Sequence, residues 1–205
     1  FINFPSDKDR MYRVLGRIRR FQREHGSRQV QGRWAYAKRL NTELGKKIAR
    51  EIVFYASENR ADVIVFEYLE MKGKLSGKKK QKLQMWRKRD IQKRCGQQAH
   101  RKGIRISRIC AWNTSRLAFD GSGKIDRDIQ DHRLCTFQNG KRYNCDLSAS
   151  YNIGARYFIR EILKPLPATE RSLLEAKVPA VKRRTSCVYA DLRDLISEME
   201  LRKAA

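Results

Sequence analysis

Apolar residues in the first part of the chain recur every three or four positions, the spacing of one helix face. This pattern predicts a short basic helix over residues 8–23 and a longer helix over residues 31–59, separated by His25-Gly26-Ser27. The apolar positions of the longer segment are Trp34, Ala37, Leu40, Leu44, Ile48 and Ile52. We expect an antiparallel helical hairpin with one apolar seam and basic outer faces.

The pattern changes to a continuous apolar run at residues 62–69, which predicts a strand buried on both faces. A lysine-rich segment with two glycines, 71–82, predicts an exposed loop. A helix over residues 83–102 and a second strand over residues 104–111 then follow. A strand, a helix and a second strand in this order favour a parallel pair joined by a right-handed crossover.

Residues 112–145 are polar and rich in turn formers, including Asp120-Gly121-Ser122-Gly123. The segment Gln138-Asn139-Gly140-Lys141 predicts a β-hairpin with a two-residue connection. A helix is expected over residues 147–163, then a linker bracketed by Pro165, Pro167 and Pro179, and a last helix over residues 190–203.

The charge of the chain sets its class of partner. Lys and Arg number 47 of the 205 residues against 22 Asp and Glu, a formal net charge of +25. Such an excess favours polyanions, and nucleic acid is the leading candidate. A membrane surface is the rival, but no segment combines a strong apolar face with lipid-anchor signals, and no run approaches the ~20 apolar residues of a bilayer span. Five cysteines, an odd count without a CxxC pair, favour a reduced cytoplasmic protein over a disulfide framework.

Two acidic residues stand out against this basic background. Glu67 ends the apolar run Val-Ile-Val-Phe, and Asp146 opens the amphipathic segment Asp-Leu-Ser-Ala-Ser-Tyr-Asn-Ile. Carboxylates at element ends suit Mg²⁺ or Mn²⁺, and the substrate for such an ion in a basic protein is a phosphodiester. The alternatives are a surface acid paired with a lysine for Glu67, and a helix N-cap for Asp146.

The order of these segments resembles the C-terminal part of the TnpB family of transposon-encoded RNA-guided DNA endonucleases, and equally the compact type V CRISPR effectors. The resemblance covers residues 8–160. It implies an RNase H-like (RuvC) α/β nuclease fold in which three acidic motifs hold two magnesium ions. By that pattern Glu67 matches the second acidic motif and Asp146 the third, while Thr114-Ser115 matches the pair that precedes the family's zinc ribbon.

The chain departs from the family at the ribbon. The family carries two CxxC pairs there, whereas Ala118, Gly121, Cys135 and Gln138 stand near those positions here. We therefore do not expect zinc, and the glycine turn and the Asn-Gly hairpin are candidates to hold the ribbon instead. The alternative is an improvised zinc site, whose ligands would be Cys110, His132, Cys135 and Cys145.

The second departure is the first acidic motif, which has no counterpart before Asp62. The expected fold class is thus α/β, an incomplete RuvC-like core with a basic helical hairpin and a degenerate ribbon insert. We expect three parts. The basic helical hairpin covers residues 1–60, the partial nuclease domain covers 61–163 with its ribbon insert at about 112–145, and a linker with the last helix covers 164–205. The chain begins at Phe1 without an initiator Met, so we expect a fragment. Because the first acidic motif is missing, we expect that the chain does not cleave DNA alone.

The resemblance implies DNA and guide RNA as partners, with the missing acid on an N-terminal portion or a companion chain. Near the two acidic motifs, candidate phosphate contacts are Arg116, Lys141 and Arg142, each of which could instead be an ordinary surface residue. The alternative function is a non-catalytic DNA- or RNA-binding module with vestigial acids. A ribosomal-type RNA binder is a third option, which the apolar strand before Glu67 disfavours.

Overall fold

The computed structural model describes residues 4–26, 30–68 and 88–204, which form two compact units. One unit comprises residues up to 64 together with 72–106, and the other comprises 65–71 together with 107–205. The predicted loop at 71–82 and the first part of the helix predicted from residue 83 lie outside the described residues.

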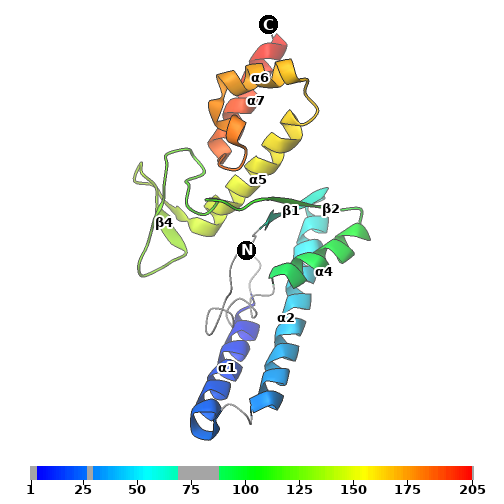
Figure 1. Ribbon diagram of the computed structural model, residues 1–205, viewed down its shortest axis with the longest axis vertical. Coiled ribbons are helices and arrows are strands. Elements are labelled where there is room, and N and C mark those ends of the chain that lie inside the picture. Colours follow the sequence, from blue (N-terminus) through cyan, green and yellow to red (C-terminus); the bar gives the residue numbers. More distant parts are fainter. Residues whose placement is uncertain (1–3, 27–29, 69–87, 205) are drawn as a thin grey trace. The chain divides into compact units, whose positions relative to one another are not determined.

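Helices α1 (Pro5–His25) and α2 (Gln31–Glu58) form the predicted hairpin of the first unit. Figure 1 shows them side by side, and the Lys47–Asp7 ion pair at 2.9 Å joins the second half of α2 to the first turn of α1. Small side chains give α2 its buried stripe, since Ala37, Ala49 and Ala56 are all buried. Helix α4 (Lys88–His100) packs on this stripe, where the Cys95 thiol donates to the Ala49 carbonyl over 3.7 Å.

Strands β1 (Val63–Tyr68) and β2 (Arg105–Cys110) pair in a two-stranded sheet. The amide of Arg105 donates to the carbonyl of Asp62 over 2.9 Å, so both strands begin at the same end and run parallel, as predicted. The prediction that β1 is buried on both faces was wrong, because every side chain from Val63 to Glu67 is only half-buried. The described residues supply β1 with one strand neighbour, β2, which leaves much of its surface uncovered.

The ribbon of the second unit is a three-stranded antiparallel sheet of β3 (Asp126–Arg127), β4 (Leu134–Thr136) and β5 (Arg142–Asn144). Cys135 faces Tyr143 in the predicted hairpin. The connection is one residue longer than predicted, because Phe137 bonds to Lys141 and the Gly140 amide bonds back to Phe137. Gly140, at φ 83°, adopts the left-handed conformation that this longer turn requires.

The remaining core of the second unit is helical. Helix α5 (Cys145–Leu163) packs against α7 (Tyr189–Ala204), and Figure 1 shows both beside α6 (Ala168–Lys177). The shared core contains Ile159, Leu163, Leu174, Val181 and Leu195, each no more than 1% exposed.

The prediction of a linker after residue 163 was wrong in part. This segment contains α6 and the 3-10 helix η2 (Pro179–Arg183), because Leu174 and Val181 anchor these short elements to the core. Pro167 stands at the N-cap of α6 and Pro179 opens η2, so the prolines start helices here rather than mark an unstructured linker. No helix of the described segments has the length and apolar character of a membrane span.

Candidate metal and nucleic-acid site

Glu67 lies near the end of β1 with its side chain half-buried. The hydroxyl of Thr114 donates to Glu67 Oε1 over 2.5 Å, and Thr114 itself is 1% exposed. A hydrogen bond from a buried hydroxyl fixes the direction in which the carboxylate points. The structure therefore brings together Glu67 and the Thr114-Ser115 pair, two of the segments on which the resemblance rests.

The backbone around Thr114 forms a tight turn. Asn113 adopts the left-handed conformation at φ 57°, and its carbonyl accepts from the amides of Arg116 and Leu117. Asparagine is among the residues that tolerate this conformation best. The turn places Thr114 toward the protein interior and Arg116 toward solvent.

Asn152 connects this turn to α5. Its side-chain amide donates to the carbonyls of Thr114 and Leu117, over 3.0 and 2.8 Å, and its oxygen accepts from the Tyr189 amide over 3.2 Å. Asn152 is fully buried, and these three bonds occupy both its donor hydrogens and its acceptor. The asparagine of the Asp146 motif thus supports the turn that orients Glu67.

Asp146 lies in the first turn of α5, exposed to solvent. It is not the N-cap: Asn144 takes that place, and its side chain accepts from the amides of Asp146 and Leu147, each over 3.0 Å. An acid in the first turn is favoured by the positive end of the helix dipole. Six residues separate Asp146 from Asn152, about 9 Å along the helix axis. That Glu67 and Asp146 share one ion stays a prediction.

Arg156, which sequence reasoning did not single out, is buried beside this site. Only 2% exposed, it donates from Nη1 to the carbonyls of Cys110 and Trp112 and from Nε to that of Cys187. Burial lowers the pKa of Arg156, an effect opposed by nearby groups that include Glu67. This guanidinium joins the end of β2 to α5 and to the segment before α7. No sequence signal separates it from the other arginines of so basic a chain.

The three predicted phosphate contacts differ in their surroundings. Arg142 forms an ion pair with Asp128 at 3.1 Å, and the Lys141 ammonium lies 5.0 Å from the centre of the Phe119 ring. Arg116 instead lines an open groove that also holds Lys124 and Arg127. These last two were missed because they flank a turn, where a basic residue usually indicates only solvent exposure.

The alternative zinc ligands do not form a set of four. In the part of the chain that the structure describes, no three His, Cys, Asp or Glu side chains gather as a metal site. Cys135 and Cys145 are buried next to each other, and burial with the neighbouring thiol raises the pKa of Cys135 to about 12. Cys110 is exposed, and the His132 ring lies against the backbone carbonyl of Asp128.

Hydrogen bonds and aromatic packing organise the ribbon. The Asp120 carboxylate accepts from the amide and hydroxyl of Ser122, over 3.0 and 2.7 Å, and from the side chain of Asn139 over 3.0 Å. Beneath this turn Phe119 packs edge-on against Phe137, with ring centres 5.7 Å apart. These contacts give a physical basis for a ribbon that folds without metal.

Comparison with known proteins gives a likeness in fold. No protein-family model matches the chain, and neither does any curated protein. A solved structure that is similar is described as "Cryo-EM structure of the Cas12f1-sgRNA-target DNA complex", with a TM-score of 0.54 and 18% sequence identity. The similarity covers 72% of this chain and 42% of that one, so the chain spans less than half of the Cas12f1 chain. At this identity the likeness shows a related mixed α/β fold.

Proposed function

We propose that this chain is the nucleic-acid-binding part of a TnpB-like RNA-guided DNA endonuclease, with a partial RuvC-like core that carries two of the metal ligands, Glu67 and Asp146. The observation that carries the proposal is the hydrogen bond from Thr114 to Glu67, in a fold similar to that of Cas12f1. The Glu67 carboxylate stands near the end of a parallel strand and is held by Thr114, which follows the neighbouring strand. A carboxylate held in one orientation in this way is suited to a catalytic role rather than to that of an ordinary surface acid.

The donor atoms fit Mg²⁺ or Mn²⁺. Thr114 occupies one side of Glu67 Oε1, and Asp146 offers an exposed carboxylate in the first turn of α5. Magnesium is commonly held by one or two carboxylates plus water and substrate phosphate, so two acids suffice for weak binding. When bound, the ion would supply Lewis acidity toward a phosphodiester.

The chain's own residues have distinct tasks in this proposal. Thr114 holds the Glu67 carboxylate in one orientation, and Asn152 holds the backbone of Thr114. The net charge of +25 attracts DNA and guide RNA, the partners present with the similar Cas12f1 chain. The third acid of the site would come from an N-terminal portion or a companion chain.

The decisive experiment titrates the purified protein with Mn²⁺ and follows free Mn²⁺ by electron paramagnetic resonance. Glu67→Gln and Asp146→Asn are each expected to raise the dissociation constant for Mn²⁺. The double variant should raise this constant by no more than the product of the two single-variant factors. Asp126→Asn is the matched control, since it removes one exposed carboxylate from the same unit. If the two variants bind Mn²⁺ as the control does, the shared ion is refuted.

Cleavage is a second test. With one of the three acids absent we expect no cutting of single-stranded DNA in Mg²⁺, because loss of a ligand misplaces the reacting groups. Cutting that Glu67→Gln abolishes would show that the chain is active alone. That outcome would support the endonuclease assignment and refute the expected dependence on a further acid.

The second candidate function is a non-catalytic DNA- or RNA-binding module. It is favoured by the net charge of +25, which attracts polyanions without any metal ion. The Mn²⁺ titration separates the two candidates, because a module with vestigial acids would bind DNA with an affinity independent of Glu67, Asp146 and the divalent ion.

A further inference from the structure

The segment that leads into α7, residues 187–190, binds three residues that lie far away in the sequence. We call this segment the α7 clamp. Its hydrogen bonds join the Cys187 carbonyl to Arg156 Nε at 2.9 Å, the Tyr189 amide to Asn152 Oδ1 at 3.2 Å, and the Ala190 amide to the Phe119 carbonyl at 2.9 Å. The sequence resemblance covers residues 8–160, so it gives the α7 clamp no role.

The two amides of the clamp are available because they belong to the first turn of α7, which begins at Tyr189. The first four N–H groups of a helix have no partner within that helix. Asp191, the third helical residue, accepts from the Val188 amide over 2.7 Å, as the acid of a capping box does. The amides of Tyr189 and Ala190 remain free for bonds to other parts of the second unit.

One of these bonds leads to the turn that orients Glu67. Asn152 is fully buried, and while its oxygen accepts from Tyr189, its amide group donates to the Thr114 carbonyl over 3.0 Å. The Thr114 hydroxyl donates to Glu67 in turn. A chain of three hydrogen bonds therefore connects the Tyr189 amide to the carboxylate, and bonds in such a buried network strengthen one another.

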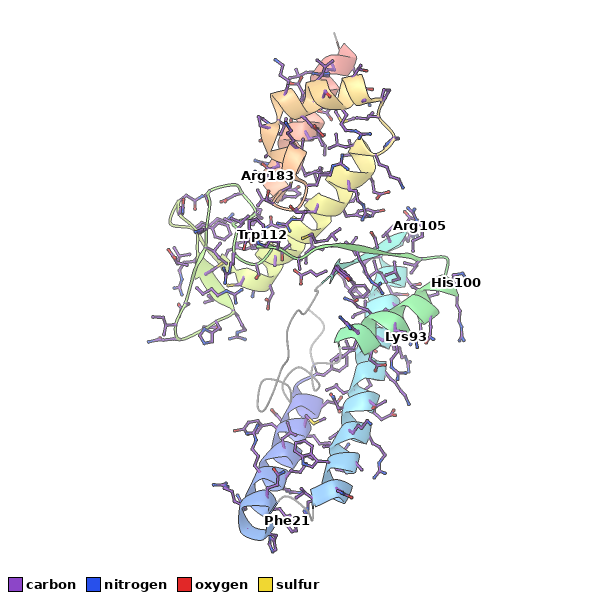
Figure 2. The ribbon with its side chains drawn as sticks, viewed as in Figure 1. Phe21, Lys93, His100, Arg105, Trp112 and Arg183 are labelled. Carbon is purple, nitrogen blue, oxygen red and sulfur yellow. The ribbon has the colours of Figure 1, made fainter. Side chains whose placement is uncertain are left out.

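The clamp also holds the chain on both sides of the turn at 113–117. Trp112, labelled in Figure 2, immediately precedes this turn, and its carbonyl accepts from Arg156 Nη1 over 2.8 Å. The Nε group of the same guanidinium is bound to Cys187 of the clamp. Phe119 follows the turn and is bound directly to Ala190. The turn is thus fixed before, within and after its tip.

We propose that the α7 clamp positions the Glu67 carboxylate, with the Tyr189 amide acting through Asn152 and Thr114. The last helix of the chain is then part of the acidic site, although it contains none of the acidic motifs. The effect on a metal ligand rests on the proposed function, whereas the rigidity of the turn does not depend on any metal.

The test uses Tyr189→Pro in the full chain. Proline has no amide hydrogen, is favoured at the first position of a helix, and requires an extended residue before it, as an N-cap usually is. Tyr189→Ala is the matched control, because it also removes the ring that packs on Phe119 and Tyr151 but keeps the amide. Ala190→Pro against Ala190→Ser repeats the comparison at the next amide, should Tyr189→Pro not fold.

Hydrogen–deuterium exchange in EDTA, measured by mass spectrometry on peptides that cover residues 113–119, reports the rigidity of the turn without metal. We expect exchange there to be at least about tenfold faster in Tyr189→Pro than in Tyr189→Ala, because the proline leaves the buried oxygen of Asn152 without its donor. Peptides from α1 and α2, in the other unit, should exchange alike in both variants. Equal exchange over residues 113–119 would overturn the proposal.

Mn²⁺ affinity, measured by electron paramagnetic resonance, tests the route to Glu67. We expect Tyr189→Pro to bind at least about threefold more weakly than Tyr189→Ala, a smaller loss than the roughly tenfold expected for a direct supporting bond. In a Thr114→Val background the same proline should have no further effect, because the route is already broken. A general loss of stability would weaken binding equally in both backgrounds, and that result would refute the route through Thr114.

The clamp and the metal site can fail separately. If Mn²⁺ binding does not depend on Glu67, the metal site is refuted, yet faster exchange in Tyr189→Pro would still establish that the clamp holds the turn. If Mn²⁺ binding depends on Glu67 while Tyr189→Pro matches Tyr189→Ala in both measurements, the clamp is refuted and the metal site stands.

Discussion

The side-chain amide of Asn152, in the middle of α5, donates to the main-chain carbonyl of Thr114 over 3.0 Å. This bond ties the helix that begins at Asp146 to the turn that orients Glu67. The two acidic segments, 79 residues apart in the sequence, are therefore linked through a single buried asparagine.

Replacing Asn152 with alanine should destabilise the second unit. The change leaves two carbonyls and one amide without their partner in a buried place, at a cost of about 2–3 kcal/mol. Urea denaturation followed by circular dichroism measures the difference. Asn59→Ala is the control, since Asn59 is exposed and its side chain donates to the Tyr55 carbonyl at the end of α2. Equal losses in the two variants would contradict the role assigned to Asn152.

Removal of the Thr114 hydroxyl should weaken metal binding with little change in shape. Thr114→Val keeps the volume of this buried side chain but cannot donate to Glu67, so the carboxylate loses this orienting hydrogen bond. Loss of such a supporting bond commonly costs about tenfold in metal affinity. Thr114→Ser keeps the hydroxyl and should bind Mn²⁺ nearly as the unaltered protein does. A valine variant with full affinity would show that Thr114 does not position Glu67.

Asp120 should make the ribbon sensitive to acid. Burial alone would raise the pKa of Asp120, but hydrogen bonds from Ser122 and Asn139 and the charge of Lys141 lower it below its usual 3.8. A folded-state pKa below that of the unfolded chain means that ionised Asp120 stabilises the fold above pH 3.8. This contribution is lost as the pH falls through the lowered value.

Asp120→Asn should therefore melt at a lower temperature than the unaltered protein at pH 7, and the difference should narrow toward pH 3. Thermal denaturation at both pH values measures this. Asp126→Asn removes an equal charge from an exposed position of the same unit and is the control. If the difference in melting temperature between Asp120→Asn and the unaltered protein widened toward pH 3, ionised Asp120 would not stabilise the fold.

The cysteines should differ sharply in their reactivity. Cys110 is exposed, whereas Cys95, Cys135, Cys145 and Cys187 are buried. Burial also raises the pKa of Cys95 and of Cys187 to about 11, which leaves almost no thiolate at neutral pH. Alkylation by iodoacetamide, mapped by mass spectrometry, should modify Cys110 at least about tenfold faster than the others. Early modification of Cys135 would indicate that the ribbon opens readily.

Most of the elements could be predicted from the sequence because their periodicity is regular. The helical hairpin, the parallel strand pair and the β-hairpin follow from spacing of apolar residues and from turn formers. Helix α6 was missed because Pro165, Pro167 and Pro179 suggested a linker, although Leu174 between them supplies an apolar anchor. A ten-residue helix with one fully buried leucine gives too little periodic signal to outweigh its prolines.

The candidate site was only partly predictable. Glu67 and Thr114 were both identified, but only the folded chain shows that they touch. Asn144 caps α5, where Asp146 was the alternative, because the helix begins one residue earlier than the acid. Arg156 could not have been found, since burial rather than residue type distinguishes it. Lys124 and Arg127 lie beside Arg116 through the bridge between Leu117 and Lys124 and the bond from Arg127 to the Ser115 carbonyl, and the sequence pattern indicates neither.

Arg156 also limits how the proposed affinity of this chain for nucleic acid can be engineered. A common way to weaken such binding is to neutralise arginines one after another, on the assumption that each faces a phosphate. Here that assumption fails at one position, because the guanidinium of Arg156 secures three backbone carbonyls inside the protein. Substitution there would abolish binding by unfolding, and a scan without a folding control would credit Arg156 with a contact to DNA.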